Sequence, residues 1–93
     1  MNTKEKRQHT PEEFFGTGDE DIRFLILHND DINSFDYVIE TLIQVCSHDM
    51  AQAEQCAFIT HYKGSCDIKK GTDAYLKPLK NKLVSRGLTA TIE

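Results

Sequence analysis

Apolar residues in this chain fall into short stretches, some spaced as in strands and others as in helices. The run RFLIL, residues 23–27, is continuously apolar after Arg23, and its length favours a well-covered strand over a helix. The segment SCDIKK, residues 65–70, places Cys66 and Ile68 in alternation with polar residues. Residues 88–93 alternate in the same way. The pattern therefore predicts three strands.

Helical spacing fills the chain between the first two predicted strands. Apolar residues recur at i, i+3, i+4 and i+7 across residues 35–46, and either Asn33 or Ser34 can cap this helix. A second helix is predicted to start at Asp49, and Gly64 is the residue expected to end it. We therefore expect two consecutive helices after the first strand.

A third helix is predicted between Thr72 and Gly87, with leucines on its apolar face. Pro78 lies within this stretch, and a proline in a helix interior removes one hydrogen bond and costs about 3 kcal/mol. The sequence leaves two possibilities. Pro78 either kinks the helix or belongs to the first turn of a helix that starts later.

The predicted order is strand, helix, helix, strand, helix, strand, which is typical of an α+β fold. The simplest architecture is a small three-stranded antiparallel sheet with three helices packed on one face (β-α-α-β-α-β). Residues 1–21 are polar and charged, with Phe14 and Phe15 as the large apolar side chains after Met1. We expect this segment to be a flexible N-terminal extension, with the Phe pair docking on the domain or on a partner, and residues 22–93 to form the folded domain.

Length and charge limit the functions to consider. A chain of 93 residues has room for one modest core and lacks the deep cleft of most enzymes, so we expect no enzymatic activity. The net charge is −4, and no stretch combines basic and aromatic residues, which argues against nucleic acid as a partner. No apolar run is long enough for a membrane span or an export signal, so we expect a cytoplasmic protein with reduced cysteines.

Polar residues at one corner of the predicted fold form a candidate site. The first strand runs into His28, Asn29, Asp30 and Asp31, and His61 lies at the end of the second predicted helix. Each has an ordinary structural explanation, because Asn and Asp form turns and a histidine at a helix end interacts favourably with the helix dipole. Turn chemistry is therefore one of two interpretations.

The second interpretation is a site for a cation. An ammonium group has three hydrogen-bond donors, and Asn29, an Asp carboxylate and a neutral His61 offer suitable acceptors. Phe35, Val38 and Ala57 could line an apolar pocket beside them, with Ala57 too small to fill the space opposite the other two. Such a site would hold an ammonium group next to a large apolar side chain.

The segments LHNDDINSFDYVIETL and AFITHYKG resemble the ClpS family, whose members are adaptors that deliver N-degron substrates to Clp proteases. The resemblance covers residues 22–66 well and the last two elements more loosely. It implies a ligand that is the N-terminal residue of a protein, usually Leu, Phe, Tyr or Trp. It also implies, as partner, the N-terminal domain of a Clp AAA+ unfoldase of the ClpA or ClpC kind, and a monomeric adaptor with no cofactor and no metal.

The resemblance assigns roles to individual residues. Asn29, Asp30 and His61 correspond to the family's ligands for the α-amino group, with Asp31 beside them. The remaining positions form the pocket for the side chain of the ligand: Asn33, Phe35, Val38, Ala57, Thr60 and Leu88.

The chain also departs from the family pattern. Many members have Met where this chain has Phe35 and Ala57, and Val where it has Thr60. A bulky residue at Phe35 is still expected to exclude β-branched ligands. Members usually present acidic and basic residues from the start of the third helix to the unfoldase, whereas Ala74 and Leu79 stand at the matching positions here.

Three other functions compete with the adaptor. A zinc site is disfavoured because no His or Cys pair has the usual ligand spacing. A Cys–His enzyme built on Cys66 and His61 would lack an evident orienting group and oxyanion donor. The third is a non-enzymatic interaction domain that resembles the C-terminal domain of the ribosomal stalk protein, with no N-degron pocket, since fold does not fix function.

Overall fold

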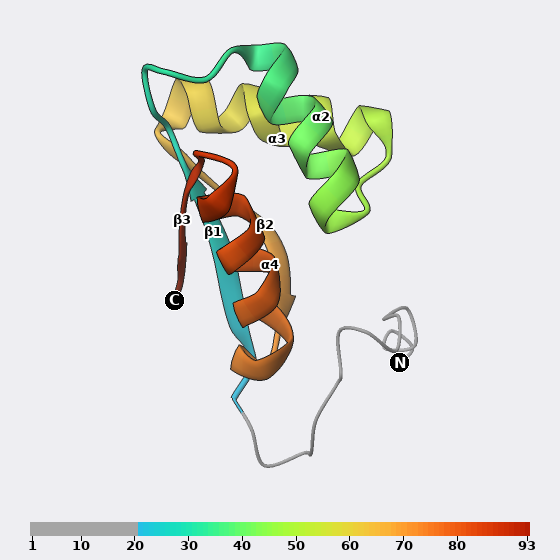
Figure 1. The fold of residues 1–93 in the computed structure, drawn as a ribbon, viewed down its shortest axis with the longest axis vertical. Helices are drawn as coiled ribbons and strands as arrows, with labels where there is room; N and C mark the ends of the chain where they lie inside the picture. Colours follow the sequence, from blue (N-terminus) through green and yellow to red (C-terminus); the bar gives the residue numbers. More distant parts are fainter. Residues whose placement is uncertain (1–20) are drawn as a thin grey trace.

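The structure, a computed structural model, describes residues 21–93 of the chain and confirms the predicted α+β fold and its order of elements (Figure 1). The expected flexible extension lies, except for its last residue, outside the described residues. The described part consists of β1 (Arg23–His28), α2 (Phe35–Cys46), α3 (Met50–Lys63), β2 (Ser65–Gly71), α4 (Asp73–Ser85) and β3 (Thr89–Ile92).

Side-chain caps fix where each helix begins. Ser34, rather than Asn33, caps α2, and its Oγ accepts a hydrogen bond from the Tyr37 backbone N–H at 3.1 Å. Asp49 caps α3 in the same way, with 2.7 Å from Oδ1 to the backbone nitrogen of Gln52. Thr72 caps α4. The predicted helix starts are therefore confirmed, and the choice at the first one is settled.

Two glycines end helices in backbone conformations that other residues rarely adopt. Gly64 follows α3 with φ of +96°, and Gly87 follows α4 with φ of +90°. Pro78 lies inside α4, so a start of this helix after the proline is wrong. Tertiary packing offsets part of the free-energy cost of Pro78, because Leu76 and Leu83 on the same helix are fully buried.

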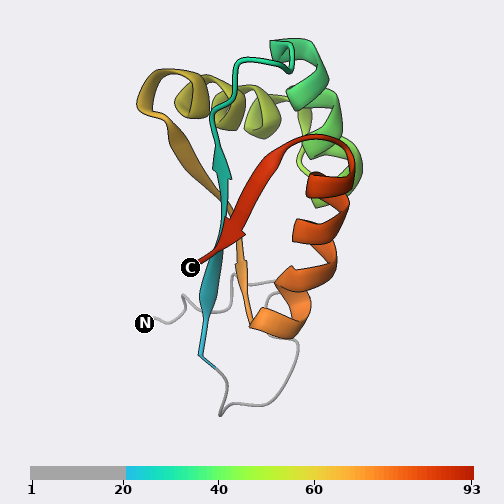
Figure 2. The ribbon, with the colours of Figure 1, turned by 60° about the vertical axis from the view of Figure 1, so that its left-hand side comes forward.

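The sheet is antiparallel with strand order β2-β1-β3, and a bulge at Ile68 shifts the register between β1 and β2. Leu25 and Leu27 of β1 face a core to which all three helices contribute. This confirms that the helices share one face of the sheet. Figures 1 and 2 show α4 lying along the sheet, and α2 and α3 placed together beyond the end of β1.

The three cysteines are free thiols, and two of them, Cys46 and Cys56, are buried. Burial raises the pKa of Cys46 to about 11, and burial together with the neighbouring Cys56 raises the pKa of Cys66 to about 12. Thiols with such pKa values are weak nucleophiles. In residues 21–93, no helix is long and apolar enough to span a bilayer.

Candidate functional site

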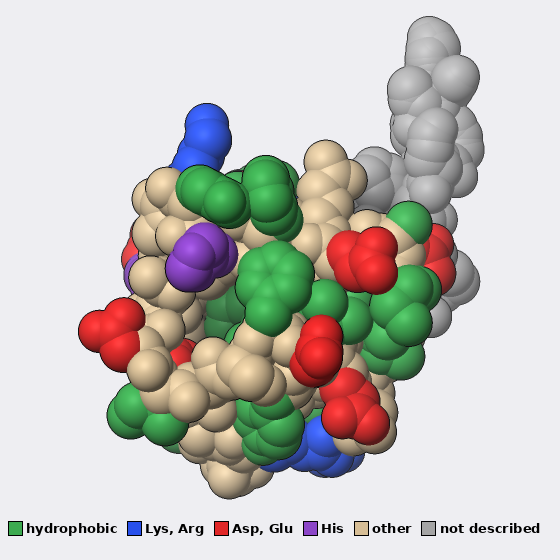
Figure 3. Space-filling model, turned by 90° about the horizontal axis from the view of Figure 1, so that it is seen from above, with side chains coloured by type: hydrophobic (Ala, Val, Ile, Leu, Met, Phe, Trp, Pro, Cys, Tyr) green, Lys and Arg blue, Asp and Glu red, His purple; other side chains and the backbone are tan. Residues whose placement is uncertain are grey.

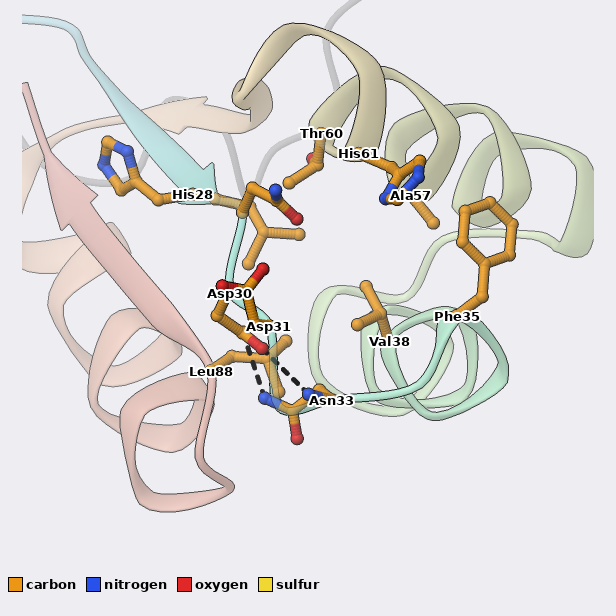
Figure 4. A pocket seen from close by; sticks show the side chains of 12 residues that line it. His28, Asp30, Asp31, Asn33, Phe35, Val38, Ala57, Thr60, His61 and Leu88 are labelled. Atoms are coloured by element: carbon orange, nitrogen blue, oxygen red, sulfur yellow. Dashed lines mark hydrogen bonds between the residues drawn. The ribbon is translucent and has the colours of Figure 1, made fainter.

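A cavity of about 310 Å³ opens where the end of β1 meets α2, α3 and the turn between α4 and β3 (Figure 4). The structure brings all ten predicted site residues to this cavity, although they come from three separate segments of the chain, 29–38, 57–61 and residue 88. Leu27 and His28 line it as well. The ten predicted residues are Asn29, Asp30, Asp31, Asn33, Phe35, Val38, Ala57, Thr60, His61 and Leu88.

The carboxylate of Asp30 is held in place by three hydrogen bonds. Its Oδ1 accepts from the backbone nitrogens of Ile32 at 2.9 Å and Asn33 at 2.8 Å, and its Oδ2 accepts from Asn33 Nδ2 at 3.0 Å. Burial opposes ionisation, but these hydrogen bonds outweigh it, so the pKa of Asp30 is lowered. A carboxylate has about four lone-pair sites, so one is left for a ligand. The turn interpretation and the binding interpretation of Asp30 are therefore compatible.

The side chain of Asn33 joins two walls of the cavity. Its Nδ2 donates both to Asp30 and, at 2.9 Å, to the carbonyl of Gly87 in the α4–β3 turn. Tyr37 holds the same turn, since its hydroxyl donates to the Arg86 carbonyl at 2.7 Å. Leu88 follows directly and is buried. The amide of Asn33 is thus committed to organising the walls, in addition to lining the pocket as predicted.

The apolar walls come from α2 and α3. Val38 and Phe35 face Ala57 and Thr60 across the cavity (Figure 4). Ala57 is 3% exposed, and its small side chain leaves the space between the helices open. The Thr60 hydroxyl donates to the Cys56 carbonyl within α3 at 2.8 Å, so its hydrogen-bonding capacity as a donor is already used. Phe35 stands at the rim, 43% exposed.

His61 faces the cavity from the last turns of α3 (Figure 4). Its ring packs edge-on against Phe35, with 6.3 Å between ring centroids, and edge-on against Tyr62 at 5.1 Å. Within residues 21–93, the imidazole has no hydrogen-bond partner, so its nitrogens are available to a ligand. The position of His61 therefore rests on aromatic packing, while its polar atoms stay free for binding.

The two segments predicted to converge are joined through the backbone. The N–H of Asn29 donates to the Gly64 carbonyl at 2.9 Å, which ties the corner after β1 to the end of α3. His28, which stands in the predicted corner without an assigned role, points toward β3, and its Nε2 is hydrogen-bonded to Thr91 Oγ1 at 2.8 Å (Figure 4). Strand alternation could have indicated this, because it places His28 and Leu27 on opposite faces.

The arrangement suits an ammonium group attached to an apolar side chain. The lining combines oxygen and nitrogen acceptors with apolar side chains. The volume lies at the lower end of the usual range for small-ligand sites, about 300–1,000 Å³. No group of three His, Cys, Asp or Glu side chains in the described part of the chain could hold a metal ion.

Comparison with known proteins gives this cavity a context. Residues 21–91 match the sequence profile of the family described as ATP-dependent Clp protease adaptor protein ClpS. The chain belongs to the ClpS family. This membership favours the ClpS interpretation over the ribosomal-stalk-like one, although both predict a small domain of helices and strands.

The ClpS fold also appears in a solved structure similar to this chain, that of Agrobacterium tumefaciens ClpS2 bound to L-phenylalaninamide. The similarity covers 77% of this chain and 94% of the other, with 19% sequence identity and a TM-score of 0.66. Comparison with curated proteins gives no match to this chain. Because the sequence identity with ClpS2 is low, this similarity shows the fold alone.

Proposed function

We propose that this ClpS-family protein is an N-degron adaptor. It binds the free N-terminal residue of a protein when that residue is bulky and apolar, and it delivers the bound protein to a Clp AAA+ unfoldase for degradation. The observation that carries the proposal is the single cavity in which Asn29, Asp30 and His61 meet an apolar wall. The related ClpS2 was solved with phenylalaninamide, a compound with a free α-amine and a benzyl side chain.

The α-amino group would be the anchor. A protonated amine has three donors, and the free lone pair of Asp30, the side-chain oxygen of Asn29 and a ring nitrogen of His61 would accept them. Charge-assisted hydrogen bonds contribute about 1.5–3 kcal/mol each. Asp31 is exposed beside them and would add attraction for a positive charge at longer range.

The side chain of the N-terminal residue would fill the apolar part of the cavity. Burying a Leu or Phe side chain contributes about 1.5–3 kcal/mol. Ala57 leaves depth for a large group, while Phe35 narrows the entrance. A side chain branched at Cβ is widest at the entrance, so Ile and Val are expected to bind more weakly than Leu, Phe, Tyr or Trp.

Delivery requires a second surface, and the start of α4 is the part of this chain that corresponds to it. The exposed residues there are Asp73 and Lys77, which form an ion pair at 3.6 Å, and Ala74. Leu79, the other departure from the family pattern, packs against the core. We propose that Asp73 and Lys77 supply the charges for a ClpA- or ClpC-like N-terminal domain, and that the adaptor acts as a cytoplasmic monomer without catalysis.

The test of ligand binding is fluorescence anisotropy with labelled peptides that differ only in residue one: Leu, Phe, Tyr, Trp, Ile, Met and acetylated Leu. Free Leu, Phe, Tyr and Trp should bind, and acetylated Leu should not. Asn29→Ala should weaken binding about 10-fold to 100-fold, since one charge-assisted bond is lost. The matched control is Asn81→Ala on the exposed face of α4. Equal affinity for the peptides with free and with acetylated Leu would refute the α-amino group as the anchor.

A further inference from the structure

A second depression, here called the outer groove, runs between the solvent-facing sides of α2 and α3. It has a volume of about 540 Å³ and is shallower and more open than the pocket. Phe35, Asp36 and Ile39 line it from α2, and Glu54 and Phe58 line it from α3. Phe35 also lines the pocket, so the outer groove begins where the pocket ends.

Aromatic rings connect the pocket to the outer groove. Phe35 contacts His61, His61 contacts Tyr62, and Tyr62 lies 4.5 Å from Phe58 between ring centroids. Phe58 is 54% exposed and Tyr62 70% exposed, so their rings face solvent. The faces of aromatic rings attract cations. The apolar surface of these rings also suits the methylene stem of a long basic side chain, which can lie along it.

The charges around the outer groove all have one sign. Asp36 lines it from one helix and Glu54 from the other, and no Lys or Arg of residues 21–93 lines it. Neither carboxylate has an ion-pair partner within residues 21–93. Figure 3 shows acidic side chains flanking a cluster of hydrophobic ones on the surface formed by α2 and α3. Apolar side chains alone would suit any apolar partner, but two unpaired carboxylates select a cation.

We propose that the outer groove binds a lysine or arginine side chain at positions two to four of the substrate whose first residue occupies the pocket. This assignment rests on the proposed function. An extended chain advances about 3.3–3.6 Å per residue, so three residues reach about 10 Å beyond the first. That reach is enough to cross the Phe35 ring that separates the two depressions. The basic head group then lies near Asp36 and Glu54, with its stem on Phe58.

The test compares peptides that begin with Leu and carry Lys, Gln or Glu at position two, three or four. At low salt, Lys at the best position should bind about threefold to fivefold more tightly than Gln, the gain typical of exposed charge pairs. The advantage should shrink at high salt because the charges are screened. Asp36→Asn with Glu54→Gln should remove the advantage, and Phe58→Ala should reduce it.

The control is Asp67→Asn, which removes one negative charge from β2, away from the outer groove, and should leave the advantage of Lys intact. Equal binding of the Lys and Glu peptides would refute the binding of a basic side chain in the outer groove, while leaving the proposed function in place. A Lys advantage that survives in the Asp36→Asn, Glu54→Gln variant would refute it as well. Failure of every free-amine peptide to bind would refute the proposed function itself.

Discussion

Asn33 illustrates how one side chain can serve both the fold and the site. Its amide donates two hydrogen bonds, one to the carboxylate of Asp30 and one to the Gly87 carbonyl. The first contributes to lowering the pKa of Asp30, and the second holds the turn that carries Leu88. The geometry of both the polar and the apolar wall therefore depends on a residue that the sequence suggests only as a cap or as a lining residue.

Replacing Asn33 tests this dependence. Asn33→Ala should lower the free energy of unfolding by about 1–2 kcal/mol, because two hydrogen bonds worth about 0.5–1.5 kcal/mol each are lost at a half-exposed site. It should also raise the pKa of Asp30, which an NMR titration of the carboxyl carbon would measure. Asn81→Ala should change neither quantity. An unchanged Asp30 titration in Asn33→Ala would contradict the role of this amide.

His48 is a buried histidine outside the site. Its Nε2 donates to the Ile68 carbonyl at 2.9 Å, and its Nδ1 has no partner among the described residues. Burial lowers the pKa of His48. The nearby Lys69 lowers it further, whereas the hydrogen bond to Ile68 and the charge of Asp49 act in the opposite direction. The folded state therefore favours neutral His48.

Stability should consequently depend on pH through His48. Because the folded pKa lies below the unfolded value of about 6.5, the stabilisation is complete above that value and is lost as the pH falls toward the folded pKa. Urea unfolding at pH 7.5 and pH 5.5 should show a smaller free energy at pH 5.5. His48→Gln should reduce this difference, whereas His61→Gln, at an exposed position, should retain it. The same pH difference in His48→Gln and wild type would exclude His48 as its source.

At the scale of elements, the hydrophobic pattern predicted every strand and helix of the described part, because the caps Ser34, Asp49 and Thr72 are local signals that act within three residues. Contacts between distant segments could not be predicted in this way. The pairing of His28 with Thr91 and that of Asn33 with Gly87 depend on how β3 aligns with β1. Periodicity within one element contains no information on that alignment.

In the candidate site, too, local features could be predicted from the sequence and contacts between distant segments could not. Its residues could be named from the sequence because the family motif keeps all of them except Leu88 within short segments, 27–38 and 57–64. The outer groove was missed, since it depends on which sides of α2 and α3 face each other. The hydrogen bond from Tyr37 to Arg86 was missed for a similar reason, because it joins α2 to the α4–β3 turn, which is far away in the chain.

Replacing Pro78 tests how much this residue affects the stability of α4. Pro78→Ala should restore a backbone N–H in the interior of α4 and stabilise the protein by about 1–2 kcal/mol. This is less than the full cost of about 3 kcal/mol because the proline also restricts the unfolded chain. Chemical denaturation would measure the change, and Lys80→Ala on the same helix serves as the control. A loss of stability in Pro78→Ala would mean that α4 needs the proline for its packing.

At the scale of the whole molecule, ligand binding should report on the complete fold. The pocket takes residues from β1, α2, α3 and the α4–β3 turn, so the unfolded chain cannot form it. Phenylalaninamide at 100 times its dissociation constant should raise the free energy of unfolding by about 2.7 kcal/mol. N-acetylphenylalaninamide, which lacks the free amine, should have no effect. Equal stabilisation by both compounds would contradict anchoring through the amine.

The strand order has one more consequence. β1 lies between β2 and β3, so the first strand of the domain pairs with the last, and Leu88 reaches the pocket only when β3 has aligned. Pairing β1 with β3 closes a loop that spans most of the domain. We expect this pairing late in folding, because the entropic cost of closing the loop precedes any favourable contact between the two strands. A refolding chain should therefore bury much of its core before its pocket is complete. Under the proposed function, an incompletely folded chain would then capture no substrate.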